Sequence, residues 1–133
     1  MRKDFEHLNF QVEKSKLAKD KIKMPVLYGV NETIEKSFDA DAYNEDNKVV
    51  VEVEAGRAYA NNQFLKDFFE AIVMNDVDYS IIAVRNDYRG NDDFSKIMKF
   101  FDTIFSSDRF SSAFERSFIN RILINYGKTQ TIQ

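Results

Sequence analysis

Hydrophobic positions along the chain follow two different periods, which predicts a mixture of helices and strands. Residues 3–20 are polar with apolar side chains at roughly helical spacing, so this stretch is expected to form an amphipathic helix. The segment 24–38 contains a short apolar stretch bracketed by Pro25 and Gly29. It is expected to supply a first strand, bent near Gly29.

The next two strands are expected to form an antiparallel hairpin. Residues 37–43, "SFDADAY", place apolar side chains on one face and Asp39 and Asp41 on the other. The polar segment 44–47 predicts a turn. Residues 48–55, "KVVVEVEA", are rich in the β-branched side chains that favour strands. Two such runs joined by a short polar turn are typical of a hairpin.

The second half of the chain alternates helical and extended patterns. A broad apolar stripe predicts a helix over residues 62–74, capped by Asn61 or Asn62. A continuous apolar run within residues 78–88 predicts a strand that is buried on both faces. The pattern then predicts a long helix over 94–105, a short helix over 113–119 and a last strand over 121–127.

The order of these elements predicts the fold class. A helix between the strands at 48–55 and 78–88 makes a crossover connection, which is expected to be right-handed. We therefore expect residues 1–133 to form a single α/β domain, in which a mixed β-sheet is flanked by helices on both faces.

Composition sets the broad class of protein. A chain of 133 residues with 44% hydrophobic and 31% charged residues is typical of a soluble globular domain with a full core. The absence of cysteine excludes disulfides, thiolate zinc sites and cysteine nucleophiles. The first ten residues contain no apolar run of the kind found in signal peptides, so a cytoplasmic location is expected.

Charge is unevenly distributed along the sequence, although the net charge is only −3. Residues 1–23 and 94–133 each carry an excess of three positive charges, whereas residues 24–93 carry an excess of nine negative charges. An acidic centre between basic ends indicates either a metal site flanked by surfaces that bind a polyanion, or an ordinary scatter of surface charge.

Two glutamates in the valine-rich strand 48–55 are the first candidates for chemistry. Glu52 and Glu54 lie two residues apart and therefore share one face of the strand, with Cβ atoms about 6.6 Å apart. Alternating valine and glutamate is what a half-solvated strand looks like. The alternative is a pair of carboxylates held together to bind a cation, because adjacent carboxylates otherwise repel one another.

The register of the hairpin decides which carboxylate joins this pair. A turn centred on residues 45–46 places Asp39 opposite Glu52, whereas a turn centred on residues 46–47 places Asp41 there. A register shifted by one residue would move both aspartates to the other face. Three carboxylates on one face suit a hard cation such as Mg²⁺.

The run "FDADAYNEDNKVVVEVEAG", with the helix "NNQFLKDFFEAIV" and the strand "YSIIAVRN" behind it, resembles the restriction-endonuclease-like or PD-(D/E)XK superfamily of nucleases. The resemblance covers about residues 5–90. It implies a core in the order helix, three strands, helix, strand (αβββαβ). The signature of this family is an aspartate at the start of one strand and a (D/E)-x-K motif on the next.

Matched to that signature, Asp39 is the family's aspartate, with Asp41 as its rival, and Glu52 is the acid of the second motif. Glu54 occupies the position of the lysine, and Lys66 on the following helix matches a displaced lysine found in some members.

The resemblance implies a nuclease that cleaves DNA with Mg²⁺, or with Mn²⁺ as a substitute, bound by Asp39, Glu52 and Glu54. Lys66 would orient the attacking water. Members that cut both strands commonly pair two sites, which implies a homodimer, and the phenylalanine-rich C-terminal third is a candidate interface. The departure at Glu54 leaves a second class open, a non-catalytic relative that binds nucleic acid or serves in assembly.

Overall fold

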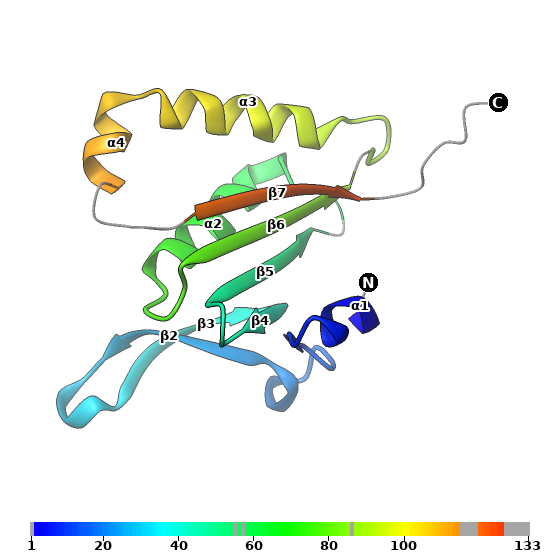
Figure 1. Ribbon diagram of the computed structural model, residues 1–133. Helices are drawn as coiled ribbons and strands as arrows, with labels where there is room; N and C mark the ends of the chain where they lie inside the picture. Colours follow the sequence, from blue (N-terminus) through cyan, green and yellow to red (C-terminus); the bar gives the residue numbers. More distant parts are fainter. Residues whose placement is uncertain (1, 55, 57, 86, 115–119, 127–133) are drawn as a thin grey trace.

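The computed structural model describes residues 2–54, 56, 58–85, 87–114 and 120–126 (Figure 1). Its helices are α1 (Arg2–His7), α2 (Gln63–Val73), α3 (Asp93–Phe105) and α4 (Asp108–Phe114), and its 3-10 turns are η1 (Ala18–Asp20), η2 (Val30–Glu32) and η3 (Ala60–Asn62). Its strands are β1 (Gln11–Val12), β2 (Ile22–Tyr28), β3 (Ile34–Ala40), β4 (Ala42–Asn44), β5 (Val49–Glu54), β6 (Tyr79–Arg85) and β7 (Asn120–Tyr126).

The described strands form a mixed five-stranded sheet and a separate two-stranded one. The larger sheet has the order β1-β4-β5-β6-β7, in which β5, β6 and β7 run parallel and β4 is antiparallel to β5. The smaller sheet is the β2–β3 hairpin, which projects from the β4 side of the larger sheet, away from α3 (Figure 1). The predicted α/β class with a mixed sheet and helices is therefore confirmed.

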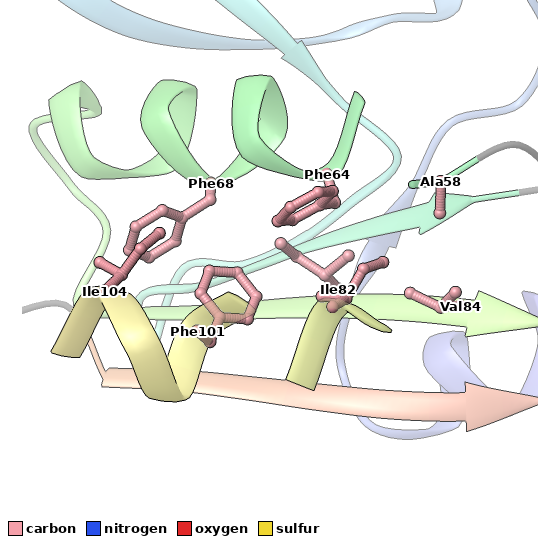
Figure 2. Close-up of a cluster of buried hydrophobic side chains, with 8 residues drawn as sticks. Ala58, Phe64, Phe68, Ile82, Val84, Phe101 and Ile104 are labelled. Carbon is pink, nitrogen blue, oxygen red and sulfur yellow. The ribbon is translucent and has the colours of Figure 1, made fainter. Parts of the chain in front are cut away.

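The main core lies where α2 and α3 pack on one face of β6. Phe64 and Phe68 of α2 meet Phe101 of α3, with ring centroids 5.6 Å and 5.1 Å apart, above Ile82 of β6 (Figure 2). These edge-to-face contacts combine burial of large apolar surfaces with favourable ring geometry. The apolar stripe predicted for residues 62–74 thus points at α3 and β6.

A second cluster fills the space between the C-terminal half of α2 and the β2–β3 hairpin. It contains Met24, Ala40, Tyr43, Val50, Ala71, Met74 and Val77. The Tyr43 hydroxyl donates a hydrogen bond to the backbone oxygen of Asp76 at 2.7 Å, so the polar end of this buried ring is satisfied. This packing fixes where β3 lies relative to α2.

On the opposite face of the sheet, α1 borders a pocket. Phe5 of α1 lines a pocket with Ala42 of β4 and Val53 of β5. Val53 is adjacent to Glu52 and Glu54 on the strand, so its side chain points away from α2. α2 and α3 thus pack on one face of the sheet, and α1 lies beside a pocket on the other.

The helix predicted over residues 3–20 is wrong beyond His7. The chain turns at Asn9, which has a φ of 61°, and Gln11 and Val12 then pair with β4 as strand β1. Asparagine tolerates this left-handed conformation better than most residues. Pairing with β4 gives the backbone groups of Gln11 and Val12 hydrogen-bond partners within the sheet. At the ends of a short polar helix, such groups would bond to water instead.

The single bent strand predicted over residues 24–38 is also wrong, because this segment folds into the β2–β3 hairpin. The chain reverses at η2, where Asn31 and Glu32 have φ values of 63° and 60°. The Gly29 amide closes the turn by donating to the Thr33 oxygen at 2.7 Å. Gly29 therefore marks a full reversal of the chain and not a bend.

The alternation predicted for "SFDADAY" breaks at Asp41. A bend separates β3 from β4, so Ala40 packs in the cluster on the α2 side whereas Ala42 faces α1. The Asp41 side chain itself bridges the interruption, because its Oδ2 accepts a hydrogen bond from the Val53 amide at 2.8 Å. A carboxylate thus takes the place of a backbone carbonyl in the ladder.

The remaining elements agree with their predicted positions. The helices over 62–74 and 94–105 are α2 and α3, and the strands over 78–88 and 121–127 are β6 and β7. Of the short helix predicted over 113–119, residues 115–119 lie outside the described residues. Within the described part of the chain, no helix has both the length and the apolar character required to cross a membrane.

Adjacent phenylalanines of α2 provide a direct test of this packing. Phe68 is 4% exposed within the core, whereas Phe69 is 58% exposed. We expect Phe68→Ala to lower the free energy of unfolding by about 3–5 kcal/mol, because it removes buried surface and leaves a cavity. Phe69→Ala is the matched control and is expected to change it by about 0.5 kcal/mol or less. Urea denaturation measures both, and equal losses would contradict the placement of α2.

Candidate functional site

A cleft of about 430 Å³ lies between the hairpin strand β3, the end of β5 and helix α2. Its walls are strongly charged. Seven carboxylates line it, from Glu13, Asp39, Asp41, Glu52, Glu54, Asp67 and Glu70, together with three lysines, Lys21, Lys23 and Lys66. All four residues of the predicted site therefore lie in one cleft, and several further charged residues lie there with them.

Strand β5 carries Glu52 and Glu54 into this cleft. In the parallel ladder they are the register partners of Ile82 and Val84, which belong to the core beneath α2 and α3. Both glutamates therefore point to the α2 side of the sheet, and both are half-buried. The core covers the first half of β5, while Glu52 and Glu54 near its end reach the open cleft.

The hairpin register places Asp41 next to Glu52. Tyr43 pairs with Val50 and Ala42 pairs with Val51, so the next position along the hairpin sets Asp41 against Glu52. This is one of the two registers that bring an aspartate to the glutamate face. Asp41 is fixed in place through the Val53 amide, and its Oδ1 lies 3.8 Å from the Lys16 amine.

Asp39 lies in the same cleft but at its outer rim. It pairs with Lys23 across the β2–β3 ladder, and the two side chains form an ion pair. The Asp39 side chain is 42% exposed, compared with 28% for Asp41. Asp41 is thus the aspartate that shares the interior of the cleft with Glu52, while Asp39 faces solvent beside a lysine.

Helix α2 supplies the opposite wall. The turn η3 swings the chain from β5 into α2 through Asn61 and Asn62, both with a φ of 56°. Asn62 occupies the N-cap position as predicted, although its side chain accepts no capping hydrogen bond. The polar face of α2 then presents Lys66 to the cleft, with its amine 3.4 Å from Glu70 Oε1.

Asp67 is a site residue that the sequence reasoning missed. It is 6% exposed and its Oδ1 accepts a hydrogen bond from Gln63 at 3.1 Å, but Oδ2 is buried and has no hydrogen-bond partner. The sequence does carry a signal for this residue, because Asp67 falls at a buried position of the helix stripe that contains Phe64 and Phe68. Charged residues are rarely buried without a partner, so such a position points to function.

Burial in the cleft raises the pKa values of Glu52 and Glu54. Burial raises the pKa of Glu52 to about 9, with further contributions from the charges of Asp41 and Asp67. Burial also raises the pKa of Glu54 to about 8, helped by a side-chain hydrogen bond with Asp67, while the Lys66 charge opposes the change. At neutral pH both glutamates therefore carry a proton unless a cation is present.

Glu13 behaves differently although it is also buried. Burial acts to raise its pKa, but hydrogen bonds from Lys16 and Lys21, at 2.9 Å and 3.0 Å, outweigh burial and lower it. The backbone amide of Glu13 also donates a hydrogen bond to the backbone oxygen of Asp41 at 2.9 Å. The segment after β1 thus clamps the backbone of Asp41 and supplies its nearest cation, Lys16.

The donor set fits a hard divalent cation. Among the described residues, no three histidine, aspartate or glutamate side chains are already arranged as a closed set of metal ligands. However, the seven acidic residues of the cleft offer carboxylate oxygens as ligands, and Oδ2 of Asp67 is a buried one. Carboxylate oxygens are the ligands that Mg²⁺ and Mn²⁺ prefer.

No protein-family model, curated protein or solved structure matches the chain. Its function is therefore inferred from the chemistry of the cleft.

The raised pKa values predict how stability depends on pH without metal. Between pH 4.5 and about 9 the folded chain retains the Glu52 proton that the unfolded chain releases. Stability should therefore fall as pH rises through this window, by an amount on the order of a few kcal/mol. Glu52→Gln should flatten the slope and raise the melting temperature at pH 8.

Thermal unfolding in EDTA at a series of pH values measures this effect. Glu45→Gln, at an exposed turn position outside the cleft, is the control and should keep the wild-type slope. Wild-type stability that increases with pH across the window would contradict the account of the cleft.

Proposed function

We propose that this chain is a Mg²⁺-dependent phosphodiesterase that cleaves DNA and has a PD-(D/E)XK-like core. The observation that carries the proposal is the meeting of Asp41, Glu52 and Glu54 with Lys66 in one cleft. These carboxylates lie together at the end of a central strand, where they repel one another, and a lysine lies opposite them. This arrangement suits metal-assisted phosphoryl chemistry.

The order of elements supports the finer assignment of the fold. After α1 and the short strand β1, the chain continues as β2, the β3–β4 pair, β5, α2 and β6, so that apart from β1 the order is helix, three strands, helix and strand. The β5–α2–β6 unit supplies the parallel crossover, and the antiparallel β4–β5 pair supplies the hairpin. Among the described strands, β2 pairs only with β3, so the first strand of such a core lies outside the larger sheet.

The residues have distinct roles in this proposal. Asp41 and Glu52 would hold the cation, with Glu54 completing the set and Asp39 able to reach it from the rim. When bound, Mg²⁺ lowers the pKa of a coordinated water and offsets negative charge on the phosphate. Glu52 and Glu54 must each release a proton before they bind the cation, because their pKa values lie near 9 and 8.

Lys66 serves as the displaced lysine of the signature. Its side chain is 63% exposed at the rim, and its charge reaches Glu54. From there it can orient a water and contact a phosphate oxygen, which are the roles expected of a positive group beside a reacting phosphodiester. Lys21 and Lys23 on the other wall can contact neighbouring phosphates of the same strand.

A non-catalytic relative is the second candidate. It is favoured by Glu54 at the lysine position and by the ion pair of Lys66 with Glu70, because an amine bound by a carboxylate is less available to a phosphate. Such a protein would bind a cation or a nucleic acid without cleaving it. Cation binding without cleavage separates this candidate from the first.

A cleavage assay with variants tests the proposed function. On plasmid DNA with Mg²⁺ or Mn²⁺, Glu52→Gln is expected to abolish cleavage and weaken the stabilisation that the metal gives. Lys66→Ala should lower the rate by on the order of 100-fold while sparing metal binding. Lys99→Ala, which removes an exposed lysine of α3 outside the cleft, is the control and should cleave at the wild-type rate.

Ca²⁺ is expected to bind in place of Mg²⁺ but to support little cleavage, because it is larger and a weaker acid towards water. Wild-type protein that is stabilised by Mg²⁺ yet never cuts DNA would favour the non-catalytic relative. The absence of any metal response would contradict both candidates.

Cutting both strands of a duplex calls for two sites, so the proposal includes a homodimer. Several phenylalanines expected at its interface pack in the core instead, since Phe101 is buried and Phe100 and Phe105 pack against the same cluster. Phe110 of α4 remains 41% exposed. We expect light scattering to give a dimer mass at tens of micromolar, and Phe110→Glu to weaken it. A monomer under these conditions would contradict the dimer.

A further inference from the structure

We propose that a surface beside the cleft binds the unpaired bases of single-stranded DNA. This surface, the tyrosine surface, consists of Tyr59, Tyr88, Arg89, Asn91 and Lys96. The inference rests on the proposed action on DNA and adds the form of the substrate, which is a strand with unpaired bases next to the site of cleavage.

The tyrosine surface lies at the edge of the sheet where β5 and β6 end. These strands run parallel, so the segments that follow them leave the sheet at the same edge (Figure 1). Glu54 at the end of β5 and Gln63 at the start of α2 both line the cleft. Tyr59 lies between them along the chain, and its ring stacks on Phe64 in the first turn of α2, with ring centroids 5.9 Å apart. The connection from β5 to α2 therefore carries the tyrosine surface next to the cleft.

Contacts between residues join the two tyrosines into one surface. Lys96 Nζ lies over the Tyr59 ring, 5.6 Å from its centroid, and donates a hydrogen bond to Asn91 Oδ1 at 3.5 Å. Asn91 in turn exchanges two backbone hydrogen bonds with Tyr88, each 3.1 Å long. The Tyr88 ring packs against Gly56, where an added Cβ atom would lie 2.3 Å from the ring atom Cε2. The two rings are therefore linked by a chain of direct contacts at the exit of β5.

A tight turn presents Arg89 beside the second tyrosine. Arg89 and Gly90 have φ values of 54° and 78°, and positive φ at both central positions is characteristic of a type I′ turn. Glycine adopts this left-handed conformation freely, whereas for arginine it is strained. The Arg89 guanidinium carbon lies 5.4 Å from the centroid of the Tyr88 ring. A strained residue that holds a cation over an aromatic ring on an exposed turn indicates a role in binding.

Aromatic faces beside cations suit the binding of single-stranded nucleic acid. Tyr59 is 39% exposed, Tyr88 is half-buried, and both cations are exposed. Bases of any kind stack on such rings, and positive side chains attract the phosphates that join them. Within a duplex the bases already stack on one another, so their faces are not available to a protein ring. The composition of the surface therefore favours unpaired bases.

The cations of this surface are available to phosphates. Among the described residues, Arg89 and Lys96 form no ion pair, whereas Lys23 and Lys66 of the cleft each pair with a carboxylate. The acidic residues near the surface accept hydrogen bonds from backbone amides, Asp87 from Gly90, Asp92 from Ser95 and Asp93 from Tyr59. The tyrosine surface thus offers a strand the positive groups that the cleft neutralises with its own carboxylates.

Binding of single-stranded DNA in EDTA tests this inference, because neither the cation site nor cleavage then contributes. Fluorescence anisotropy with a labelled oligothymidylate of about 12 nucleotides is expected to show tighter binding than with the matching duplex. Tyr59→Leu keeps an apolar side chain but removes the aromatic face, so it should weaken binding on the order of 10-fold. Tyr59→Phe keeps the face and should bind like wild type. The matched control is Tyr79→Leu, which removes a tyrosine that is 41% exposed at the other end of β6 and should leave binding unchanged.

Arg89→Gly is the second variant and separates binding from folding. It relieves the left-handed strain, so in thermal unfolding it should be at least as stable as wild type, yet it should bind single strands more weakly. A purely structural turn would lose no binding on this change.

No binding by wild type, equal or tighter binding of the duplex, or unchanged binding in Tyr59→Leu and Arg89→Gly overturns the inference. Single-strand binding that depends on Tyr59, with no cleavage once Mg²⁺ is added, supports this surface and overturns the proposed catalysis. Cleavage by wild type without any preference for single strands supports the proposed function and overturns this surface.

Discussion

The repulsion among carboxylates at the end of β5 is the constraint on which the site depends. Strand β5 is central in the sheet, so its direction is fixed by ladders on both sides, and Glu52 and Glu54 cannot turn away from the cleft. Burial removes the water that would otherwise screen them, and Asp67 on α2 faces the same space. Only protons or cations can relieve this repulsion. Burial that raises the pKa values of Glu52 and Glu54 to about 9 and 8 favours protons in this role when no cation is bound.

The rest of the fold holds these groups in place. The phenylalanine cluster between α2 and α3 fixes α2 over β6 (Figure 2). The second cluster fixes the β2–β3 hairpin against the other end of α2. Two independent packed regions therefore form the two walls of the cleft. The N-terminal segment adds a third restraint, because Glu13 binds the Asp41 backbone and gathers two lysines beside it. Such a rigid frame holds the carboxylates of the cleft close together against their mutual repulsion.

Hydrophobic periodicity predicted the helices and strands that pack into the core. It failed where a turn sets the direction of the chain. The helices α2 and α3 and the strands β5 and β6 carry long apolar patterns, and each was predicted within a few residues. The N-terminal helix and the bent first strand were wrong because the left-handed residues Asn9 and Asn31 reverse the chain, which hydrophobic spacing does not encode. Glu52 and Glu54 were found from their spacing. The choice between Asp39 and Asp41 needed the register, and Asp67 was missed because it stands in a stripe that looks like core.

The central claim is that this cleft binds a divalent cation through Asp41 and Glu52. The most direct measurement is a crystal structure of the chain soaked in Mn²⁺, with anomalous scattering data collected at the manganese edge. The account predicts an anomalous peak about 2.0–2.3 Å from oxygens of both residues, a distance typical of carboxylate ligands to small divalent ions. A map with no peak in the cleft, and Glu52 and Glu54 still in contact as protonated carboxyls, would contradict it.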